Sequence, residues 1–254
     1  MEPVYSAANA LGRGLIRGLG LRISLEGTHR IPTHGPAVLV APHTAFVDFP
    51  LVEYAAIRRG RYVRFLTRHD VWRLPVVRGA MDRMRHVPVD REAPAAAYLR
   101  ARSLLREGEV VGVFPEAGVS TSFTVRALMP GAVALAAETG APLVPVVLWG
   151  AQRVFTAKTR PDLTRGRPVD LVVGEPIHYR AGVDVRAETT ALGHRLQAML
   201  EELQRRPRHQ PAPGERAPWH PAHLGGHAPT AAQARLSESL PATAVPPAWA
   251  PRDR

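Results

Sequence analysis

Short apolar runs alternate with segments of helical periodicity along most of the chain, and this alternation constrains the fold more than any other feature. The runs at 36–43, 109–118 and 142–150 are almost continuously apolar, which is typical of strands buried on both faces. Helical segments are expected at 49–59, 93–107 and 130–139. Strands that alternate with helices predict an α/β fold, with a largely parallel central sheet flanked by helices.

The length of 254 residues suits a single such domain, which we place at residues 21–206. Residues 1–20 form an amphipathic segment before it, with arginines opposite a broad apolar face made of Leu11, Leu15, Ile16 and Leu19. Two interpretations of this face stay open. It is either a contact with a membrane surface or an ordinary element packed on its own domain.

Residues 207–254 differ sharply in composition, being rich in proline, alanine and histidine with little periodicity. Such a composition predicts a disordered tail. His220, His223 and His227 are spaced closely enough to collect a metal ion adventitiously. Without a folded scaffold they do not form a site, so no metal site is expected in this chain.

The net charge of +11 comes almost entirely from arginine, because Lys158 is the only lysine. A basic surface favours anionic membranes or nucleic acid as partners. The absence of cysteine excludes disulfides, thiol nucleophiles and cysteine-ligated metals. No apolar run is long enough to predict a transmembrane helix, and the first residues lack the order of a signal peptide.

The stretch "PHTAFVD" places His43 at the end of an apolar run and Asp48 five positions later. In a straight strand the two would be roughly 16 Å apart on opposite faces. They meet only if the chain turns after His43 and a helix begins near Asp48. The pair then suits a general base, since a carboxylate fixes the tautomer of the imidazole and stabilises its charged form. Alternatively, Asp48 is a helix N-cap and His43 a buried structural imidazole.

Three further stretches occur in a particular order after this one: "HVPVDR" with Arg91, "VFPEAGVS" with Glu116, and "APLVPVVLWG" with Pro145. Together with "PHTAFVD" they resemble the four motifs of the glycerolipid acyltransferases, the family that includes lysophosphatidic acid acyltransferase. The resemblance covers roughly residues 20 to 200. Pro145 removes a ladder hydrogen bond from its strand, which favours a strand edge or a bend.

The resemblance implies an O-acyltransferase that moves a fatty acyl group from acyl-CoA or acyl-carrier-protein to the hydroxyl of a lysophospholipid, most simply 1-acyl-glycerol-3-phosphate. It implies that His43 is the general base and that Asp48 orients it. By the same resemblance Arg91 binds phosphate, while Glu116, Ala117 and Gly118 bind the acceptor. No cofactor is expected. The family and the basic charge imply a peripheral or monotopic protein on the cytoplasmic side of an anionic membrane, with no nucleic-acid partner.

The chain departs from the family in the acceptor motif, where Val119 replaces the second phosphate-binding arginine. Arg126, a few residues further on, is a candidate replacement. Pro42 and Ala45 also stand where the family more often has asparagine and serine. The acceptor is therefore open: a lysophospholipid leads, and a glycolipid or another non-phosphate acceptor is the alternative.

Three other functions compete with this interpretation. A hydrolase would use Ser120 or Ser122, but "GVSTS" lacks the second glycine of a nucleophile elbow. A nucleic-acid-binding module would need clustered basic residues or a known signature, and neither occurs. A catalytically silent, basic, membrane-binding member of the fold is the third alternative.

Overall fold

A seven-stranded sheet forms the centre of the molecule, with the strand order β1-β7-β6-β2-β5-β3-β4. The structure is a computed structural model that describes residues 2–90, 93–116, 118–238 and 241–245. The strands are β1 Arg22–Glu26, β2 Ala37–Val40, β3 Val63–Arg68, β4 Val87–Val89, β5 Val110–Val113, β6 Leu143–Trp149 and β7 Pro168–Val173. All neighbouring strands are parallel except β6 and β7, which are antiparallel, so the predicted largely parallel α/β sheet is confirmed.

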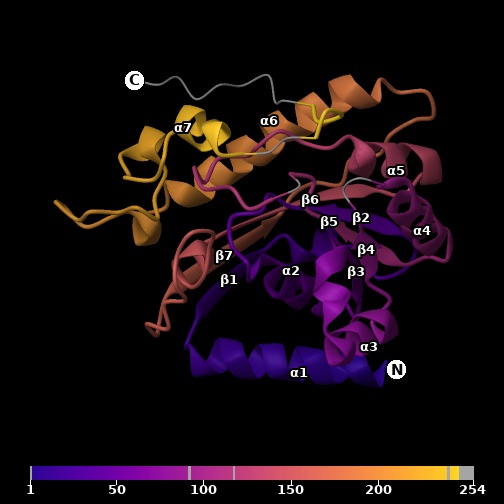
Figure 1. The fold of residues 1–254 in the computed structure, drawn as a ribbon, viewed down its shortest axis with the longest axis horizontal. Helices are drawn as coiled ribbons and strands as arrows, with labels where there is room; N and C mark the ends of the chain where they lie inside the picture. The colour runs from indigo at the N-terminus through magenta and orange to yellow at the C-terminus, as the bar shows by residue number, and fades with distance from the viewer. Residues whose placement is uncertain (1, 91–92, 117, 239–240, 246–254) are drawn as a thin grey trace.

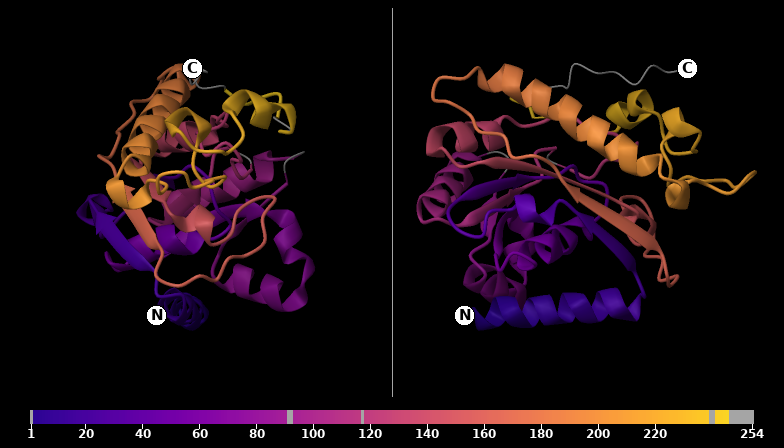
Figure 2. Two further views of the ribbon diagram at one scale, coloured as in Figure 1. Left: turned by 90° about the vertical axis from the view of Figure 1, so that its left-hand side faces the viewer. Right: turned by 180° about the vertical axis from the view of Figure 1, so that it is seen from behind.

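Helices cover both faces of this sheet. They are α1 Pro3–Gly18, α2 Asp48–Ile57, α3 Pro75–Arg83, α4 Ala95–Arg106, α5 Gly131–Thr139, α6 Val185–Gln204 and α7 Ala231–Leu236. Short 3-10 turns join them at η1 Thr28–Arg30, η2 His69–Arg73, η3 Ala151–Arg153, η4 Pro207–His209 and η5 Ala222–Leu224. In Figure 1 and Figure 2, α1, α2 and α3 lie on one side of the sheet, and α5, α6 and α7 lie on the other. The three helices predicted from periodicity end within two residues of their observed bounds.

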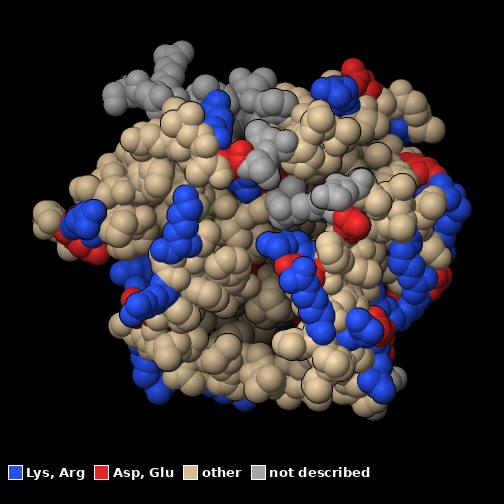
Figure 3. Space-filling view, in the orientation of Figure 1, with Lys and Arg blue, Asp and Glu red and all other residues tan. Residues whose placement is uncertain are grey.

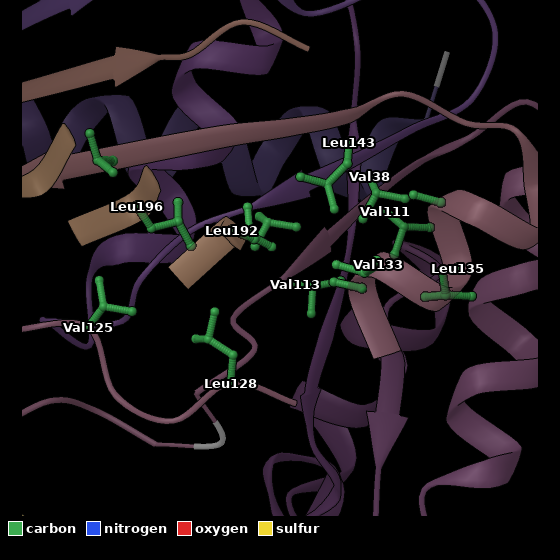
Figure 4. Close-up of a cluster of buried hydrophobic side chains, with 14 of the residues drawn as sticks. Val38, Val111, Val113, Val125, Leu128, Val133, Leu135, Leu143, Leu192 and Leu196 are labelled. Carbon is green, nitrogen blue, oxygen red and sulfur yellow. The ribbon is translucent and has the colours of Figure 1, made fainter. Parts of the chain in front are cut away.

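Two apolar clusters hold these layers together. One lies between the sheet and α2 and includes Leu51, Val52 and Ala55. The larger cluster lies on the opposite face, where Figure 4 shows valine and leucine side chains of the central strands beside those of α5 and α6. The valine-rich strands β2, β5 and β6 are buried throughout. The continuous apolar runs therefore have the cause predicted for them, which is burial on both faces.

Pro145 lies inside β6, in the interior of the sheet, so the expected strand edge is wrong. Its position explains why a proline is tolerated there. It is the last residue of β6 that pairs with β2, and pairing with β7 begins at the next residue, Val146. Gly174 leaves room for the ring, because a Cβ on Gly174 would lie 2.9 Å from Cγ of Pro145.

The segment after α6 is folded in the stretches that the structure describes. Residues 207–238 contain η4, η5 and α7, and Val245 pairs with Leu128 in an antiparallel bridge. His209 and His220 are completely buried. The disorder predicted for residues 207–254 is therefore wrong for 207–238 and 241–245, because buried polar anchors fix them to the domain. The remainder of the predicted tail lies outside the described residues.

Candidate functional site

The candidate site lies where two neighbouring parallel strands end. β2 and β5 pair up to Val40 and Val113, and His43 and Glu116 each follow three residues after these positions. Parallel strands place their carboxyl ends at the same edge of a sheet, which is where open α/β sheets hold ligands. The two loops are joined directly, since the backbone N–H of Ser120 donates a 2.7 Å hydrogen bond to the carbonyl of His43.

The side chains of His43 and Asp48 are in contact, as the spacing predicted. The chain turns after His43, α2 begins at Asp48, and Nδ1 of His43 lies 2.9 Å from Oδ2 of Asp48. The same oxygen accepts 2.8 Å hydrogen bonds from the backbone N–H groups of Thr44 and Ala45. Asp48 therefore turns back toward the preceding loop and makes no side-chain cap on its own helix, which removes the N-cap alternative.

This geometry assigns the roles of the two imidazole nitrogens. A carboxylate only accepts hydrogen bonds, so Nδ1 of His43 carries the proton that it shares with Asp48. The second nitrogen, Nε2, then carries a lone pair. The Asp48 side chain is fully buried, whereas 20% of the His43 side chain is exposed. An oriented imidazole that is partly exposed is the arrangement that a general base requires.

Aromatic contacts restrain the His43 ring. The ring centroid of Phe114 lies 4.6 Å from that of His43, with the two planes tilted by 30°, and the Phe65 ring stacks on Phe114 at 6.0 Å. Gly112 on β5 makes this arrangement possible, because a Cβ there would lie 2.5 Å from the Phe65 ring. Thr156 adds a further restraint by donating a 2.6 Å hydrogen bond to the carbonyl of Thr44. The imidazole is therefore held in place by elements far apart in the sequence.

Glu116 is buried beside this pair, with an exposed fraction of 1%. Burial raises the pKa of its carboxyl well above the ordinary range, and the Arg126 guanidinium and backbone N–H groups of Arg126 and His43 offset this only in part. Gly118 lies against the same arginine, since a Cβ on Gly118 would be 2.4 Å from Nη1 of Arg126. The structure thus brings together Glu116, Gly118, Arg126 and the His43 loop.

Two of the residues predicted to bind substrate, Arg91 and Ala117, lie outside the described residues. Ser120 and Ser122, the candidates for a hydrolase, are buried, and the Ser120 hydroxyl donates to the carbonyl of Thr124 at 2.7 Å. Neither serine forms a hydrogen bond with a histidine side chain among the described residues, which counts against a serine nucleophile.

The three tail histidines have separate surroundings rather than a common centre. The His220 ring lies edge-on to Trp149, His223 lies 3.2 Å from Glu201, and Nδ1 of His227 accepts from the backbone N–H of Ala217. In the described part of the chain, no three histidine, cysteine or acidic side chains are placed to hold a metal ion.

Sequence reasoning missed one member of this site, Glu238. It lies just after α7, and its Oε1 is 2.9 Å from Nε of Arg126. No local pattern marks this residue, because it is separated from Arg126 by most of the second half of the chain.

Figure 3 shows a hollow on the face presented in Figure 1, above α1, with mostly uncharged walls and Lys or Arg side chains around it.

Comparisons with known proteins show the family of the chain. The profile of the Acyltransferase family matches residues 22–149, half of the chain, from the start of β1 to the end of β6. A chloroplastic 1-acyl-sn-glycerol-3-phosphate acyltransferase of Arabidopsis thaliana is 29% identical over 161 residues, which cover 62% of this chain and 44% of the relative. A 1-acyl-sn-glycerol-3-phosphate acyltransferase of Bacillus subtilis is 27% identical over 200 residues, covering 78% of this chain and 92% of the relative.

Among solved structures, the 1-acyl-sn-glycerophosphate acyltransferase of Thermotoga maritima is similar with a TM-score of 0.67 at 22% identity, covering 79% of this chain and 80% of that one. This likeness shows the fold. The chain spans less than half the length of the plant relatives that it matches. The family profile, by contrast, covers every strand from β1 to β6 and the loops that carry His43, Asp48 and Glu116. The chain belongs to the Acyltransferase family.

Proposed function

We propose that the protein transfers a fatty acyl group from an acyl thioester, acyl-CoA or acyl-carrier-protein, to the hydroxyl of a lysophospholipid, with 1-acyl-sn-glycerol 3-phosphate as the leading acceptor. The observation that carries the proposal is the contact between His43 and Asp48, which leaves Nε2 of a fixed imidazole free to accept a proton. The relatives in Arabidopsis and Bacillus are 1-acyl-sn-glycerol-3-phosphate acyltransferases, which supports the choice of acceptor.

The proposed reaction needs no covalent enzyme intermediate. Nε2 of His43 takes the proton of the acceptor hydroxyl while the hydroxyl oxygen attacks the thioester carbonyl. The new C–O bond forms, the C–S bond breaks, and the thiolate leaves with a proton returned from the imidazolium. Asp48 stabilises the positive charge on the ring during this step, since its carboxylate contacts Nδ1. Glu116 and Gly118 are proposed to line the acceptor side, together with Arg91 and Ala117.

The test measures thiol release by the purified protein from acyl-CoA and from acyl-carrier-protein, with lysophosphatidate, other lysophospholipids and glycolipids as acceptors. We expect His43→Ala to keep the fold and to lose about 10²- to 10⁴-fold in rate, the usual contribution of a general base. His34→Ala, which changes an exposed histidine, is the matched control. Undiminished release by His43→Ala would overturn the mechanism, and no release with any pair of substrates would indicate a silent member of the fold.

We also propose that the protein works at a membrane surface that it meets through α1 and the neighbouring η2–α3 segment. Leu11 and Leu15 of α1 are strongly exposed, as are Leu74 and Val76 at the start of α3. The two helices lie side by side in Figure 1 and are in contact. The described helices include none long and apolar enough to cross a bilayer. Exposed leucine and valine with arginine nearby suit contact with an anionic lipid surface.

A further inference from the structure

Two peptide groups in the turn after His43 hold the carboxylate of Asp48. The backbone N–H groups of Thr44 and Ala45 each donate a 2.8 Å hydrogen bond to Oδ2 of Asp48. The same oxygen lies 2.9 Å from Nδ1 of His43. A single carboxylate oxygen therefore receives all three contacts, and the direction in which it holds the imidazole depends on where the two N–H groups lie.

The carbonyl side of each of these peptide groups is bonded as well. A peptide group is planar, so a hydrogen bond to its carbonyl also restrains the N–H of the next residue. The backbone N–H of Ser120 donates to the carbonyl of His43, at 2.7 Å. The hydroxyl of Thr156 donates to the carbonyl of Thr44, at 2.6 Å. The two amides that bind Asp48 are therefore fixed from two other loops.

Of these two outer donors, Thr156 alone uses its side chain. Thr44 and Thr156 are both buried, and among the described residues no other donor reaches the carbonyl of Thr44. A buried carbonyl without a donor is costly. Hydrogen bonds in a chain also polarise one another. The hydroxyl of Thr156 therefore strengthens the N–H of Ala45 as a donor to Asp48.

The segment that carries Thr156 is fixed against the same turn. The backbone N–H of Phe46 donates to the carbonyl of Phe155, at 3.0 Å, and the centroids of these two rings are 4.8 Å apart. On the other side, the hydroxyl of Thr159 donates to the carbonyl of Thr156, at 2.9 Å. Contacts at two consecutive residues, 155 and 156, thus hold the Thr156 hydroxyl on its acceptor.

We infer that Thr156 is a positioning residue that acts on the imidazole of His43. It acts through the peptide group that joins Thr44 to Ala45 and through the carboxylate of Asp48, not by contact with the reacting atoms. This inference rests on the proposed acyl transfer, and it extends the site to a segment outside the family profile over residues 22–149. Loss of the hydroxyl should slow the proton transfer and leave the binding of both substrates unchanged.

The test compares Thr156→Val, which removes the hydroxyl and keeps the shape, with Thr156→Ser, which keeps the hydroxyl. Acyl transfer to 1-acyl-sn-glycerol 3-phosphate is measured in a single turnover at saturating substrates, so that product release does not limit the rate. For Thr156→Val we expect this rate to fall about 10-fold, because the base remains and only its orientation is loosened. KM for each substrate should change less than about twofold. Thr156→Ser should stay within about threefold of the wild type.

Thr189→Val is the matched control. Thr189 is also buried, and its hydroxyl donates a 2.6 Å hydrogen bond to the carbonyl of Val185, within α6. We expect its single-turnover rate to match that of the wild type. An equal fall in Thr156→Val and in either Thr189→Val or Thr156→Ser would overturn the inference, and so would an undiminished rate in Thr156→Val. If Thr156→Val does not fold, Thr156→Ala replaces it, because alanine places no methyl group against the carbonyl.

Amide hydrogen exchange measures the same contact without turnover. In Thr156→Val the N–H of Ala45 should exchange about 5- to 10-fold faster than in the wild type, while the amides of α6 keep their rates. Unchanged exchange at Ala45 would overturn the inference. The proposed function fails separately, since a wild type that acylates no acceptor contradicts the acyl transfer, whereas the exchange rates still test whether Thr156 holds the turn.

Discussion

The two ends of the chain pack on opposite faces of the same sheet, and they do so by different means. α1 lies under the α2 side, whereas residues 207–238 lie over the α6 side (Figure 2). α1 keeps Leu11 and Leu15 exposed at 77% and 57%. The C-terminal segment instead buries two histidines completely. The end that looks apolar in the sequence is thus partly exposed, and the end that looks disordered is partly buried.

The attachment of α1 is mainly polar. Tyr5 and Asn9 donate hydrogen bonds to the buried carboxylate of Glu53 on α2, and the Tyr5 ring stacks on Tyr62. Of the predicted apolar face, Ile16 packs against the core and Leu19 is almost buried. The interpretation as an element packed on its own domain is therefore confirmed for one half of the face, and the membrane interpretation of the other half stays a prediction. The exposed half is available for contact with something outside the molecule.

The attachment of the C-terminal segment depends on one buried acid. Oδ2 of Asp170, on β7, lies 3.0 Å from Arg206, 2.9 Å from Arg208 and 3.3 Å from Nε2 of His209. The next anchor is His220, whose ring packs edge-on to Trp149. These contacts join residues far apart in the sequence. A composition rich in proline and histidine therefore does not prevent order when a sheet supplies the partners.

The largest expected effect comes from ending the chain at Arg206. Removal of the segment takes Arg208 and His209, two of the three basic partners, from the buried Asp170 and uncovers Trp149. Arg206 stays 3.0 Å from Asp170 in the shortened chain, so part of the buried charge keeps a partner. Loss of the other two partners and of the apolar surface around Trp149 together should lower the free energy of unfolding by about 3–5 kcal/mol. Equilibrium denaturation by urea measures it. A chain that ends at Val245 is the control for shortening, and an unchanged midpoint in the shorter chain would contradict the comparison.

At the other end, the Leu11→Ser/Leu15→Ser double variant should alter membrane binding and leave stability nearly unchanged. Both side chains are largely exposed in the folded protein, so their loss removes little packing. Insertion of two leucines at a lipid surface is worth up to about 3 kcal/mol, which corresponds to roughly a 100-fold fall in partition to anionic vesicles.

Vesicle sedimentation measures this partition, and binding by the wild type should also weaken with added salt. Leu99→Ser/Leu163→Ser is the matched control, because these two leucines are exposed to a similar degree away from α1. Equal loss of binding in both double variants would show that α1 has no special role. A fall in the thermal midpoint of the Leu11→Ser/Leu15→Ser protein would instead show that its exposed face is structural.

Local patterns predicted most of the fold. Continuous valine runs identified β2, β5 and β6, because burial on both faces leaves the same local pattern wherever the strand lies. The contact between His43 and Asp48 was also predictable, since only a turn followed by a helix start brings residues at this spacing together. The strands were predictable because the apolar pattern repeats within one element. The His43–Asp48 contact was predictable because the two residues are close in the sequence.

Contacts between distant segments were not predictable from one sequence. Glu238 meets Arg126 on the same part of the chain where Val245 pairs with Leu128, and no local pattern predicts either contact. Pro145 is tolerated in an interior strand because the pairing of β6 with β2 ends at this residue and the pairing with β7 begins at the next one. The sequence around Pro145 does not show where these pairings start and stop. Each of these features depends on how distant elements are aligned with one another, and this alignment cannot be predicted from the composition of either element.

The anchor of α1 gives the smallest expected effect, a change in how stability depends on pH. Burial raises the pKa of Glu53 from 4.5 to about 7, although Val63 N–H, Asn9, Tyr5 and Arg64 oppose this. Between these pH values the folded protein keeps a proton that the unfolded chain releases. The free energy of unfolding therefore falls as the pH rises through this window.

His86 acts in the opposite direction. Its pKa is lowered from 6.5 to about 4 by burial and by Arg64, against a smaller effect of Glu2, so stability falls as the pH drops through that window. The two slopes oppose each other from pH 4.5 to 6.5.

Glu53→Gln removes the group that makes the free energy of unfolding fall as the pH rises. The variant should gain stability relative to the wild type as the pH rises from 4.5 to 7, by about 2 kcal/mol. Urea denaturation across this range measures the difference, with Glu202→Gln, an exposed change on α6, as the control. A difference that does not vary with pH would mean that Glu53 is ionised in the folded protein as it is in the unfolded chain. α1 would then be held by a charged anchor, as the C-terminal segment is by Asp170.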